Sequence, residues 1–275
     1  SICLSGSRYD NIFLMINRRN KCAMTIVPIP LIAGNWKMNG TVELASDLAS
    51  QLVKLISKEE YNSFEVLLCP SFPLLAATYS KICGTPILLG GQDCHEKEEG
   101  PYTGDVSARM LKNVGCQYVI VGHSERRTSY LEKDILVQAK AEAAQRAALI
   151  PIICVGESLE EREEGRAEEV VMEQLRASMP EGATAFNTVI AYEPLWAIGT
   201  GLTPTTNDIV KMHAKLREIV ADKIANYESL RILYGGSVNP KNASEIMNLE
   251  NVNGGLVGGA SLKAADFWSV VSACK

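Results

Sequence analysis

The chain has 275 residues, of which 47% are hydrophobic and 21% are charged, and its formal net charge is −5. This composition is sufficient for a large buried core, and the negative charge gives no general attraction to nucleic acid or acidic membranes. No run approaches the ~18 consecutive apolar residues of a membrane span, so we expect neither a membrane nor a nucleic acid as partner.

The eight cysteines are scattered singly along the chain. No Cys-x-x-Cys pair occurs, so a zinc ribbon or a redox dithiol is not expected. Several cysteines fall inside apolar patterns, where cysteine behaves as a small hydrophobic residue. Scattered single thiols favour a reducing, cytoplasmic environment.

The first 23 residues differ in composition from the rest, with four basic residues against one acidic residue. The segment is a poor secretory signal, because its apolar stretch Ile12–Ile16 is short and most of the charge follows it. We expect residues 1–28 to form a disordered extension without a catalytic role. A transit peptide and non-native sequence ahead of a start at Met24 are the alternatives.

From Pro28 onward, a short apolar run, a loop and a longer amphipathic stretch follow one another repeatedly. The short runs are nearly continuous in apolar character, as expected for strands that are covered on both faces. We predict eight such strands: Leu31–Trp36, Phe64–Cys69, Pro86–Gln92, Gln117–Gly122, Ile150–Val155, Thr188–Glu193, Arg231–Gly236 and Gly254–Gly258.

The intervening stretches have the pattern of amphipathic helices. After the first strand, apolar residues recur four apart on one face, at Leu44, Leu48, Leu52 and Ile56. A polar cluster at Thr206–Asp208 opens the helix before the seventh strand. The buried face of that helix is predicted at Ile209, Val210, Met212, Leu216 and Val220. The charge-dense segment Glu160–Glu173 is interpreted as a solvated helix face.

Alternating strands and helices predict an α/β fold with parallel strands and right-handed crossovers. Eight units within residues 29–275 match the size of a single (β/α)8 barrel domain, and a doubly wound open sheet is the structural alternative.

Polar and glycine-rich segments follow five of the predicted strands. In a (β/α)8 barrel the reactive groups lie at the C-terminal ends of the strands, so these segments should share one rim. They are Asn35–Lys37, His123–Arg127, Glu193–Trp196, Gly235–Ser237 and Gly258–Ser261.

The two glycine turns after the seventh and eighth strands predict an anion site. Glycine allows the backbone to approach a ligand closely, and its N–H groups can face phosphate oxygens. A single Gly-Gly turn is weak support, but two at consecutive strand ends, each followed by a small residue and a helix, favour phosphate binding, which recurs at this place in barrels.

Glu193 and His123 each follow an apolar run directly. Partial burial would raise the pKa of Glu193 and make it a useful base, whereas the alternative is a structural carboxylate paired with an arginine. His123 is either an acid–base group or a structural histidine. Because adjacent His123 and Ser124 should point in different directions, a serine nucleophile is not expected. No zinc or magnesium ligand pattern occurs, so we expect no metal and no cofactor.

The segment between Pro194 and Thr205 contains Gly199 and Gly201. Rigid ends around a tip of small residues are typical of a lid that swings as one body, and the alternative is an ordinary surface loop.

Five motifs together resemble the triosephosphate isomerase family, in family order and spacing, over residues 29–275. They are Ala33–Asn39, Gly122–Arg127, Ala191–Gly201 without position 195, Tyr234–Ser237 and Leu256–Leu262. The resemblance implies interconversion of dihydroxyacetone phosphate and D-glyceraldehyde 3-phosphate, a step of glycolysis and gluconeogenesis, by proton transfer through an enediolate.

The resemblance also implies roles for individual residues. Glu193 would be the base, and His123 would be an electrophile that works as neutral imidazole. Lys37 would supply positive charge, and Asn35 would orient the substrate oxygens. Glu125 and Ser124 would orient these groups. Backbone N–H groups for the phosphate would come from Gly199, Ser237, Gly258 and Gly259.

The segment Gly100–Gly104 resembles the intersubunit loop of the family. It would insert into a partner barrel near Asn35, Lys37 and His123, with Thr103 as a buttress, which implies a homodimer. Leu202 and Pro204 depart from the lysine and alanine that the family often has in its lid, which bears on the kinetics of the lid.

Two other functions remain as alternatives. The same chemistry could act on a four-carbon ketose phosphate, although the intact segment Trp196–Gly201 favours the smaller substrate. A non-enzymatic scaffold or binding role would require the loss of Glu193, His123 or Lys37, and all three are present.

Overall fold

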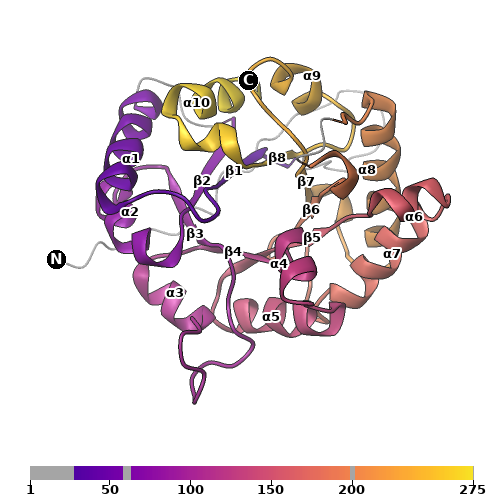
Figure 1. The fold of residues 1–275 in the computed structure, drawn as a ribbon, viewed down its shortest axis with the longest axis horizontal. Coiled ribbons are helices and arrows are strands. Elements are labelled where there is room, and N and C mark those ends of the chain that lie inside the picture. Colours follow the sequence, from indigo (N-terminus) through magenta and orange to yellow (C-terminus); the bar gives the residue numbers. More distant parts are fainter. Residues whose placement is uncertain (1–27, 58–62, 199–201, 275) are drawn as a thin grey trace, which may run out of the picture.

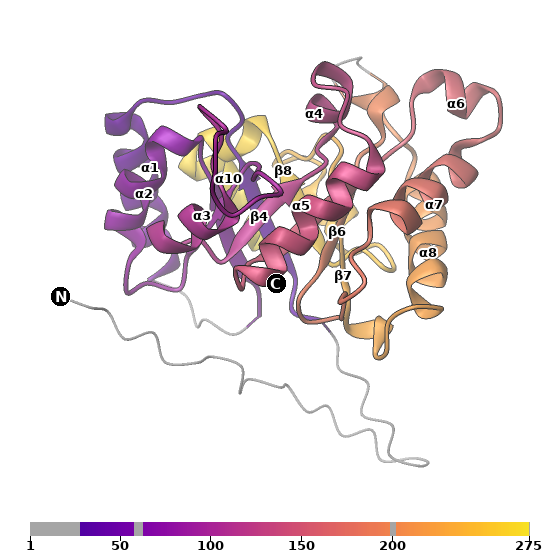
Figure 2. The ribbon, with the colours of Figure 1, turned by 90° about the horizontal axis from the view of Figure 1, so that it is seen from below.

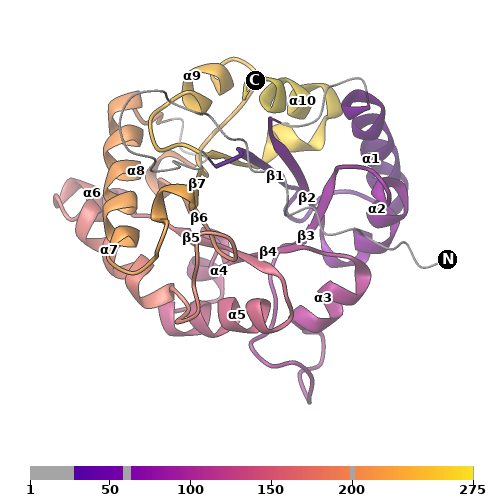
Figure 3. The ribbon, with the colours of Figure 1, turned by 180° about the vertical axis from the view of Figure 1, so that it is seen from behind.

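A computed structural model of the chain describes residues 28–57, 63–198 and 202–274. In these residues eight parallel strands close into a barrel in sequence order, and β1 pairs with β8. Figures 1 and 3 show the strands inside a ring of helices from opposite sides. The predicted (β/α)8 barrel is confirmed, since a sheet with β1 joined to β8 is not open. The expected extension at residues 1–28 lies outside the described residues except for Pro28.

Each predicted strand coincides with an observed one to within two residues at either end. The strands are β1 Leu31–Asn35, β2 Glu65–Cys69, β3 Leu88–Gly91, β4 Tyr118–Val121, β5 Ile150–Val155, β6 Val189–Tyr192, β7 Arg231–Tyr234 and β8 Gly254–Val257.

Helices cover the outside of the barrel in the order in which they leave the strands. They are α1 Val42–Ile56, α2 Leu75–Ile82, α3 Ala108–Val114, α4 Ser124–Ser129, α5 Asp134–Arg146, α6 Leu159–Glu163, α7 Ala167–Ser178, α8 Thr206–Ala221, α9 Ala243–Met247 and α10 Ala264–Ser272. Short 3₁₀ turns include Leu195–Ala197 after β6 and Gly259–Leu262 after β8.

Successive strand residues alternate between two hydrophobic clusters. In β1, Leu31 and Ala33 belong to a cluster inside the barrel, whereas Ile32 belongs to the larger cluster between the strands and the helices. Both faces of the strands are therefore covered, which explains why the strand sequences are apolar at nearly every position.

One face of α1 differs from its prediction. Leu48, Leu52 and Ile56 are buried as expected, but Leu44 is 61% exposed and Ala45 is buried instead. With 3.6 residues per turn, each step of four residues advances by about 40°, so three steps carry Leu44 about 120° away from Ile56. The prediction for Leu44 is wrong because this drift takes it off the packed face.

The helix before β7 begins as predicted. Thr205 is the N-cap of α8, and its side chain and that of Asp208 form a reciprocal capping box. On its packed face Val210 is only half-buried, whereas His213 is fully buried. The charge-dense segment 160–173 spans α6 and the start of α7, and its charged side chains are exposed or half-buried, as expected for a solvated face.

A polar network closes the barrel at the N-terminal ends of its strands. Arg231 begins β7, Glu65 begins β2 and Tyr118 begins β4. The Arg231 guanidinium donates to the Glu65 carboxylate and to the Tyr118 hydroxyl, and that hydroxyl donates to Glu65 at 3.0 Å. The three side chains therefore satisfy one another's hydrogen-bonding groups across the barrel, at the end opposite the glycine turns.

The segment between β3 and α3 projects beyond the ring of helices (Figure 1). Residues Gly100–Gly104 in it are exposed, and the ring of Tyr102 lies on the imidazole of His95 with the ring centroids 4.1 Å apart.

Candidate active site

The structure brings the site residues of the described chain together at one rim. Because all eight strands are parallel, the segments that follow them emerge at the same end, and the side view in Figure 2 shows α4 and α6 at that end. Asn35 ends β1, His123 and Glu193 follow β4 and β6, and Gly235 and Gly258 follow β7 and β8.

Glu193 is 2% exposed and makes three polar contacts with the start of α4. Its Oε2 accepts the backbone N–H of Ser124 at 3.0 Å, and its Oε1 accepts the Ser124 hydroxyl at 3.0 Å. Oε1 also lies 2.9 Å from Nε2 of His123. The ion-pair partner of this carboxylate in the described chain is therefore a histidine and not an arginine.

Burial raises the pKa of Glu193, but the charge that His123 carries when it is protonated, the hydrogen bond from His123 and the two donors of Ser124 outweigh it, so the pKa lies below its ordinary value. The raised pKa expected from burial is therefore wrong for this arrangement, because the donors stabilise the ionised form more than burial destabilises it. The Glu193 carboxylate is therefore ionised and is bound by His123 and Ser124, two further residues of the predicted site.

His123 is the N-cap of α4, and its ring is oriented from both nitrogens. The backbone N–H of Glu125 donates to Nδ1 at 3.3 Å, which assigns a lone pair to Nδ1 and the ring proton to Nε2, facing Glu193. Burial lowers the pKa of His123, and the carboxylates of Glu193 and Glu125 raise it by more, so it lies above its ordinary value. Among the groups that raise this pKa, Glu193 contributes more than Glu125.

The expectation that His123 and Ser124 point in different directions is wrong. Both side chains contact Oε1 of Glu193, because they occupy the N-cap and the first position of one short helix that faces the end of β6. The Ser124 hydroxyl donates to the carboxylate of Glu193 and not to the imidazole of His123. Ser124 is therefore not arranged as a nucleophile activated by histidine.

Lys37 has a left-handed backbone conformation, with φ of 54°. This conformation is strained for a residue with a side chain and persists where its surroundings fix it. The Lys37 N–H donates to Oδ1 of Asn35 at 3.0 Å, and Nε2 of Gln92 donates to the Lys37 carbonyl at 2.8 Å. The Lys37 Nζ lies 2.6 Å from Oε1 of Glu125.

Gln92 was missed as a site residue by sequence reasoning. Its Nε2 also donates to the carbonyl of Cys69 at 2.9 Å, so it ties the turn after β1 to the end of β2. The signal was present, because Gln92 is a polar residue directly after an apolar strand, as Glu193 is.

The glycine turns adjoin the charged groups. A Cβ on Gly258 would lie 3.5 Å from Cε of Lys37, and a Cβ on Gly235 would lie 2.9 Å from Cγ of Glu193. Gly259 faces open space, and Ser237 is exposed. The side chains of Lys37 and Glu193 therefore each lie against a glycine backbone. The contact between Gly235 and Glu193 was not predicted from the sequence.

The two ends of the predicted lid are described, but Gly199 lies outside the described residues. At the first end, Nε1 of Trp196 donates to Oε1 of Glu157 at 2.8 Å. At the second end, Pro204 is buried and Thr205 caps α8. Leu202 is 48% exposed.

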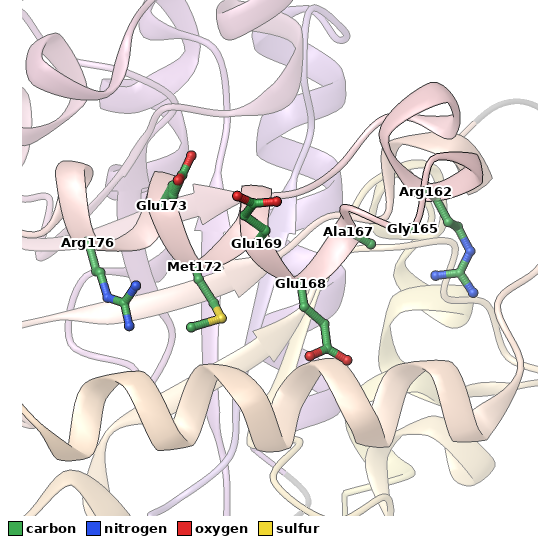
Figure 4. A pocket seen from close by; sticks show the side chains of 8 residues that line it. All are labelled: Arg162, Gly165, Ala167, Glu168, Glu169, Met172, Glu173 and Arg176. Carbon is green, nitrogen blue, oxygen red and sulfur yellow. The ribbon is translucent and has the colours of Figure 1, made fainter.

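The arrangement combines a carboxylate base, an imidazole N–H donor and a cation beside glycine backbones. Such groups can remove a carbon-bound proton, stabilise the oxyanion that forms and bind a phosphate. A separate groove of about 900 Å³ along α6 and α7 contains none of these groups and is lined by charges of both signs (Figure 4).

Comparison with known proteins agrees with this geometry. Residues 30–274 match the sequence model of the family described as Triosephosphate isomerase. Triosephosphate isomerase of Afipia carboxidovorans is 53% identical over 89% of this chain and 97% of its own length, and that of Xanthobacter flavus is 51% identical over 91% and 99%. The crystal structure of triosephosphate isomerase from Bartonella henselae superposes with a TM-score of 0.83 at 47% identity, over 89% of this chain and 98% of that one. The chain belongs to the triosephosphate isomerase family.

Proposed function

We propose that this chain is an aldose–ketose isomerase that interconverts dihydroxyacetone phosphate and D-glyceraldehyde 3-phosphate. The observation that carries the proposal is the pairing of a buried carboxylate, Glu193, with Nε2 of His123 at 2.9 Å, on the rim where Lys37 lies against Gly258. Family membership over residues 30–274 supports the same reaction.

Glu193 acts as the base in this proposal. In the substrate-free arrangement three donors hold it ionised. When it turns to the substrate it leaves those donors for a site from which water is excluded, so its pKa rises and it accepts a proton from carbon more readily. It then returns the proton to the neighbouring carbon. The hydroxyl proton passes from one substrate oxygen to the other beside Nε2 of His123, which completes the conversion of one triose phosphate into the other.

His123 and Lys37 stabilise the enediolate. The Nε2–H of His123, released from Glu193, donates to the substrate oxygens while Nδ1 stays bound to the N–H of Glu125. Lys37 places a positive charge near the developing oxyanion and the phosphate, and Asn35 fixes the backbone of Lys37 through Oδ1. Preorganised donors of this kind are each worth roughly 10²–10³ in rate.

Four backbones carry the phosphate in this proposal, namely those of Gly199, Ser237, Gly258 and Gly259. Support comes from the open space at Gly259 and from the Ser261 hydroxyl, which donates to the Gly258 carbonyl at 2.6 Å and fixes that turn. Glu125, which is bound to Lys37 and to His123 Nδ1 through its backbone, orients both groups.

A coupled assay with D-glyceraldehyde 3-phosphate tests the proposal. The wild-type enzyme should turn over rapidly, and Glu193→Gln, which removes the base with little change of shape, should lose nearly all kcat. A four-carbon ketose phosphate should be measured in parallel. Faster turnover of the four-carbon substrate would refute the assigned substrate, and near-wild-type turnover in Glu193→Gln would refute the assigned base.

The functional unit in this proposal is a homodimer joined through the loop Gly100–Gly104. The loop is exposed and projects beyond the helices. Further large apolar side chains are exposed in the segments after β1 and β4, among them Met38, Tyr130, Leu131 and Ile135. A second copy of the chain that covered these side chains would bring its own loop close to Lys37 and His123.

We place the enzyme in the cytoplasm as part of this proposal. The buried thiols of Cys69, Cys94, Cys116 and Cys154 are free, as a reducing environment allows. Separately, no helix in the described chain is both long and apolar enough to cross a bilayer.

A further inference from the structure

Arg162 contacts three residues that come from separate segments of the chain. It lies on α6, in the loop between β5 and α7. Its NH2 donates to Oδ1 of Asp208 at 2.7 Å, its NH1 lies 3.6 Å from Oε1 of Glu157, and its guanidinium carbon stands 4.2 Å above the ring of Trp196. Trp196 lies at the first end of the expected lid, and Asp208 lies three residues after its last residue, Thr205.

The carboxylate of Glu157 requires a positive charge nearby. It is fully buried, and its Oε1 accepts hydrogen bonds from Trp196 Nε1 at 2.8 Å and from the Tyr192 hydroxyl at 3.0 Å. Burial raises the pKa of Glu157, and these donors together with the charge of Arg162 offset part of that rise. Arg162 is the cation within 4 Å of this carboxylate in the described chain.

Asp208 divides its two oxygens between the cap of α8 and Arg162. Oδ2 accepts the backbone N–H of Thr205 at 2.9 Å and the Thr205 hydroxyl at 2.7 Å, while Oδ1 accepts Arg162. The start of α8 is therefore bound to α6 by a charge-assisted hydrogen bond, which is stronger than one between neutral groups.

We infer that Arg162 is a positioning residue for the isomerase reaction, which holds the turn Leu195–Ala197 and the start of α8 against α6. A planar guanidinium can stack on an indole and bind two carboxylates at once, and a lysine ammonium cannot do both. The base is coupled to this arrangement, because Glu193 precedes Trp196 by three residues and Leu195 N–H donates to the Glu157 carbonyl at 3.1 Å. The inference rests on the proposed function.

Figure 4 shows Arg162 at one end of the groove along α6 and α7, with Arg176 at the other end. The Arg162 side chain is 30% exposed, so it can be replaced without opening the hydrophobic core.

Arg166, four residues later, supplies a matched control. In the described structure its side chain donates two hydrogen bonds, both to Glu164 in its own loop, at 2.8 and 2.6 Å.

The experiment compares the variants Arg162→Met, Arg162→Lys and Arg166→Met with the wild type, each as the complete 275-residue chain. Two quantities are measured: kcat and KM with D-glyceraldehyde 3-phosphate, and the inorganic phosphate released per isomerisation. Displacement of Trp196 and of the start of α8 would admit water to the enediolate, which then loses phosphate. In Arg162→Met we expect kcat to fall by about tenfold to a hundredfold with little change in KM, because small displacements of the reacting groups have effects of this size. Phosphate release per turnover should rise several-fold.

Arg162→Lys should give an intermediate deficit, and Arg166→Met should match the wild type in both quantities. Equal kcat and equal phosphate release in a folded Arg162→Met and in Arg166→Met would overturn the inference. If Arg162→Met does not fold, Asp208→Asn, which keeps an oxygen for the Thr205 cap, replaces it together with Arg162→Lys. Wild-type values in both of those would overturn the inference equally. An inactive wild-type enzyme would instead refute the proposed function.

Discussion

At the scale of single residues, the contacts of the proposed base, Glu193, determine how strongly its carboxylate can accept a proton. Glu193 is bound to a backbone N–H, a hydroxyl and an imidazole in the absence of substrate, and all three belong to His123 and Ser124. In the proposed mechanism, movement from these donors toward a substrate changes the carboxylate from a weak base into a stronger one. The position of the side chain therefore matters as much as its chemical nature.

Glu193→Asp tests this dependence on position. The shorter side chain withdraws the carboxylate by about 1 Å, which can lower the rate by about 10²-fold. We expect kcat to fall with a smaller change in KM, measured by steady-state kinetics in both directions. A turnover number within twofold of the wild type would show that the distance from base to substrate is not critical.

Gly235→Ala tests the same contact from the opposite side. The new Cβ would lie 2.9 Å from Cγ of Glu193 and 3.0 Å from the carbonyl of Tyr192, so the base must shift by a few tenths of an ångström. We expect kcat/KM to fall by about tenfold to a hundredfold. Gly182→Ala is the control, because its Cβ would lie 3.4 Å from a flexible Gln145 side chain, and its activity should be unchanged. Equal activities would contradict the assigned contact.

The sequence predicted which residue types meet at the rim, because parallel strands deliver their C-terminal ends to one place. It did not predict their hydrogen bonds. His123 and Ser124 both contact one carboxylate because α4 begins at Ser124, and residue patterns do not locate a helix start to a single residue. The direction of the pKa shift of Glu193 depends on how many donors bind its carboxylate. The role of Gln92 depends on a backbone conformation of Lys37 that residue spacing does not reveal.

At the scale of elements, α8 packs a histidine where the sequence pattern predicted only apolar residues. His213 is fully buried, with Nδ1 3.0 Å from the Asn251 carbonyl and its ring against those of Tyr192 and Tyr234. Burial lowers the pKa of His213 from 6.5 to about 4. The Nε2 has no hydrogen-bond partner in the described structure, so a proton there would be buried without compensation.

This histidine makes the stability of the fold depend on pH. The folded state disfavours the proton, so the full stability is present above pH 6.5 and is lost as the pH falls from there toward about 4. At pH 5 we expect the free energy of unfolding to be lower by about 2 kcal/mol than at pH 7.5 from this group alone.

Urea unfolding at both pH values, at one fixed protein concentration, measures this loss. His213→Gln cannot take up a proton, so the difference between the two pH values should be smaller by that amount than in the wild type. An equal difference in both proteins would show that His213 does not contribute to acid sensitivity.

Periodicity was a reliable guide to elements where the packed face is wide, and failed at its margins. Leu44 leaves the packed face of α1 because each step of four residues rotates the helix by slightly more than one full turn. Val210 in α8 is only half-buried, at the edge of the packed face. The eight strands were predictable because burial on both faces leaves almost no polar position in them.

At the scale of the whole molecule, the proposed dimer places one barrel's loop beside another barrel's site. Thr103→Arg tests this arrangement, because an added cation beside the partner's Lys37 would be repelled. We expect the dimer to dissociate at least about tenfold more readily, since like charges brought together at an interface cost several kcal/mol. Turnover should fall with dilution. Sedimentation velocity and activity, measured over the same concentration range, report both.

Ser244→Arg on α9 is the matched control, because α9 lies across the ring of helices from the projecting loop (Figure 1). Ser244 is exposed, so the new charge should leave both sedimentation and turnover unaffected. Identical dissociation of the two variants, or a fully active monomer, would contradict the proposed interface.

The polar network of Glu65, Tyr118 and Arg231 has a consequence for how such a protein evolves. It closes one end of the same strands whose other ends carry the chemistry. Substitutions that affect stability and substitutions that affect catalysis therefore fall at opposite ends of the same strands. During evolution, catalysis can change with little effect on stability, and stability with little effect on catalysis. A mutant library confined to the loops after β6, β7 and β8 would sample new substrates while the closed end continues to hold the barrel together.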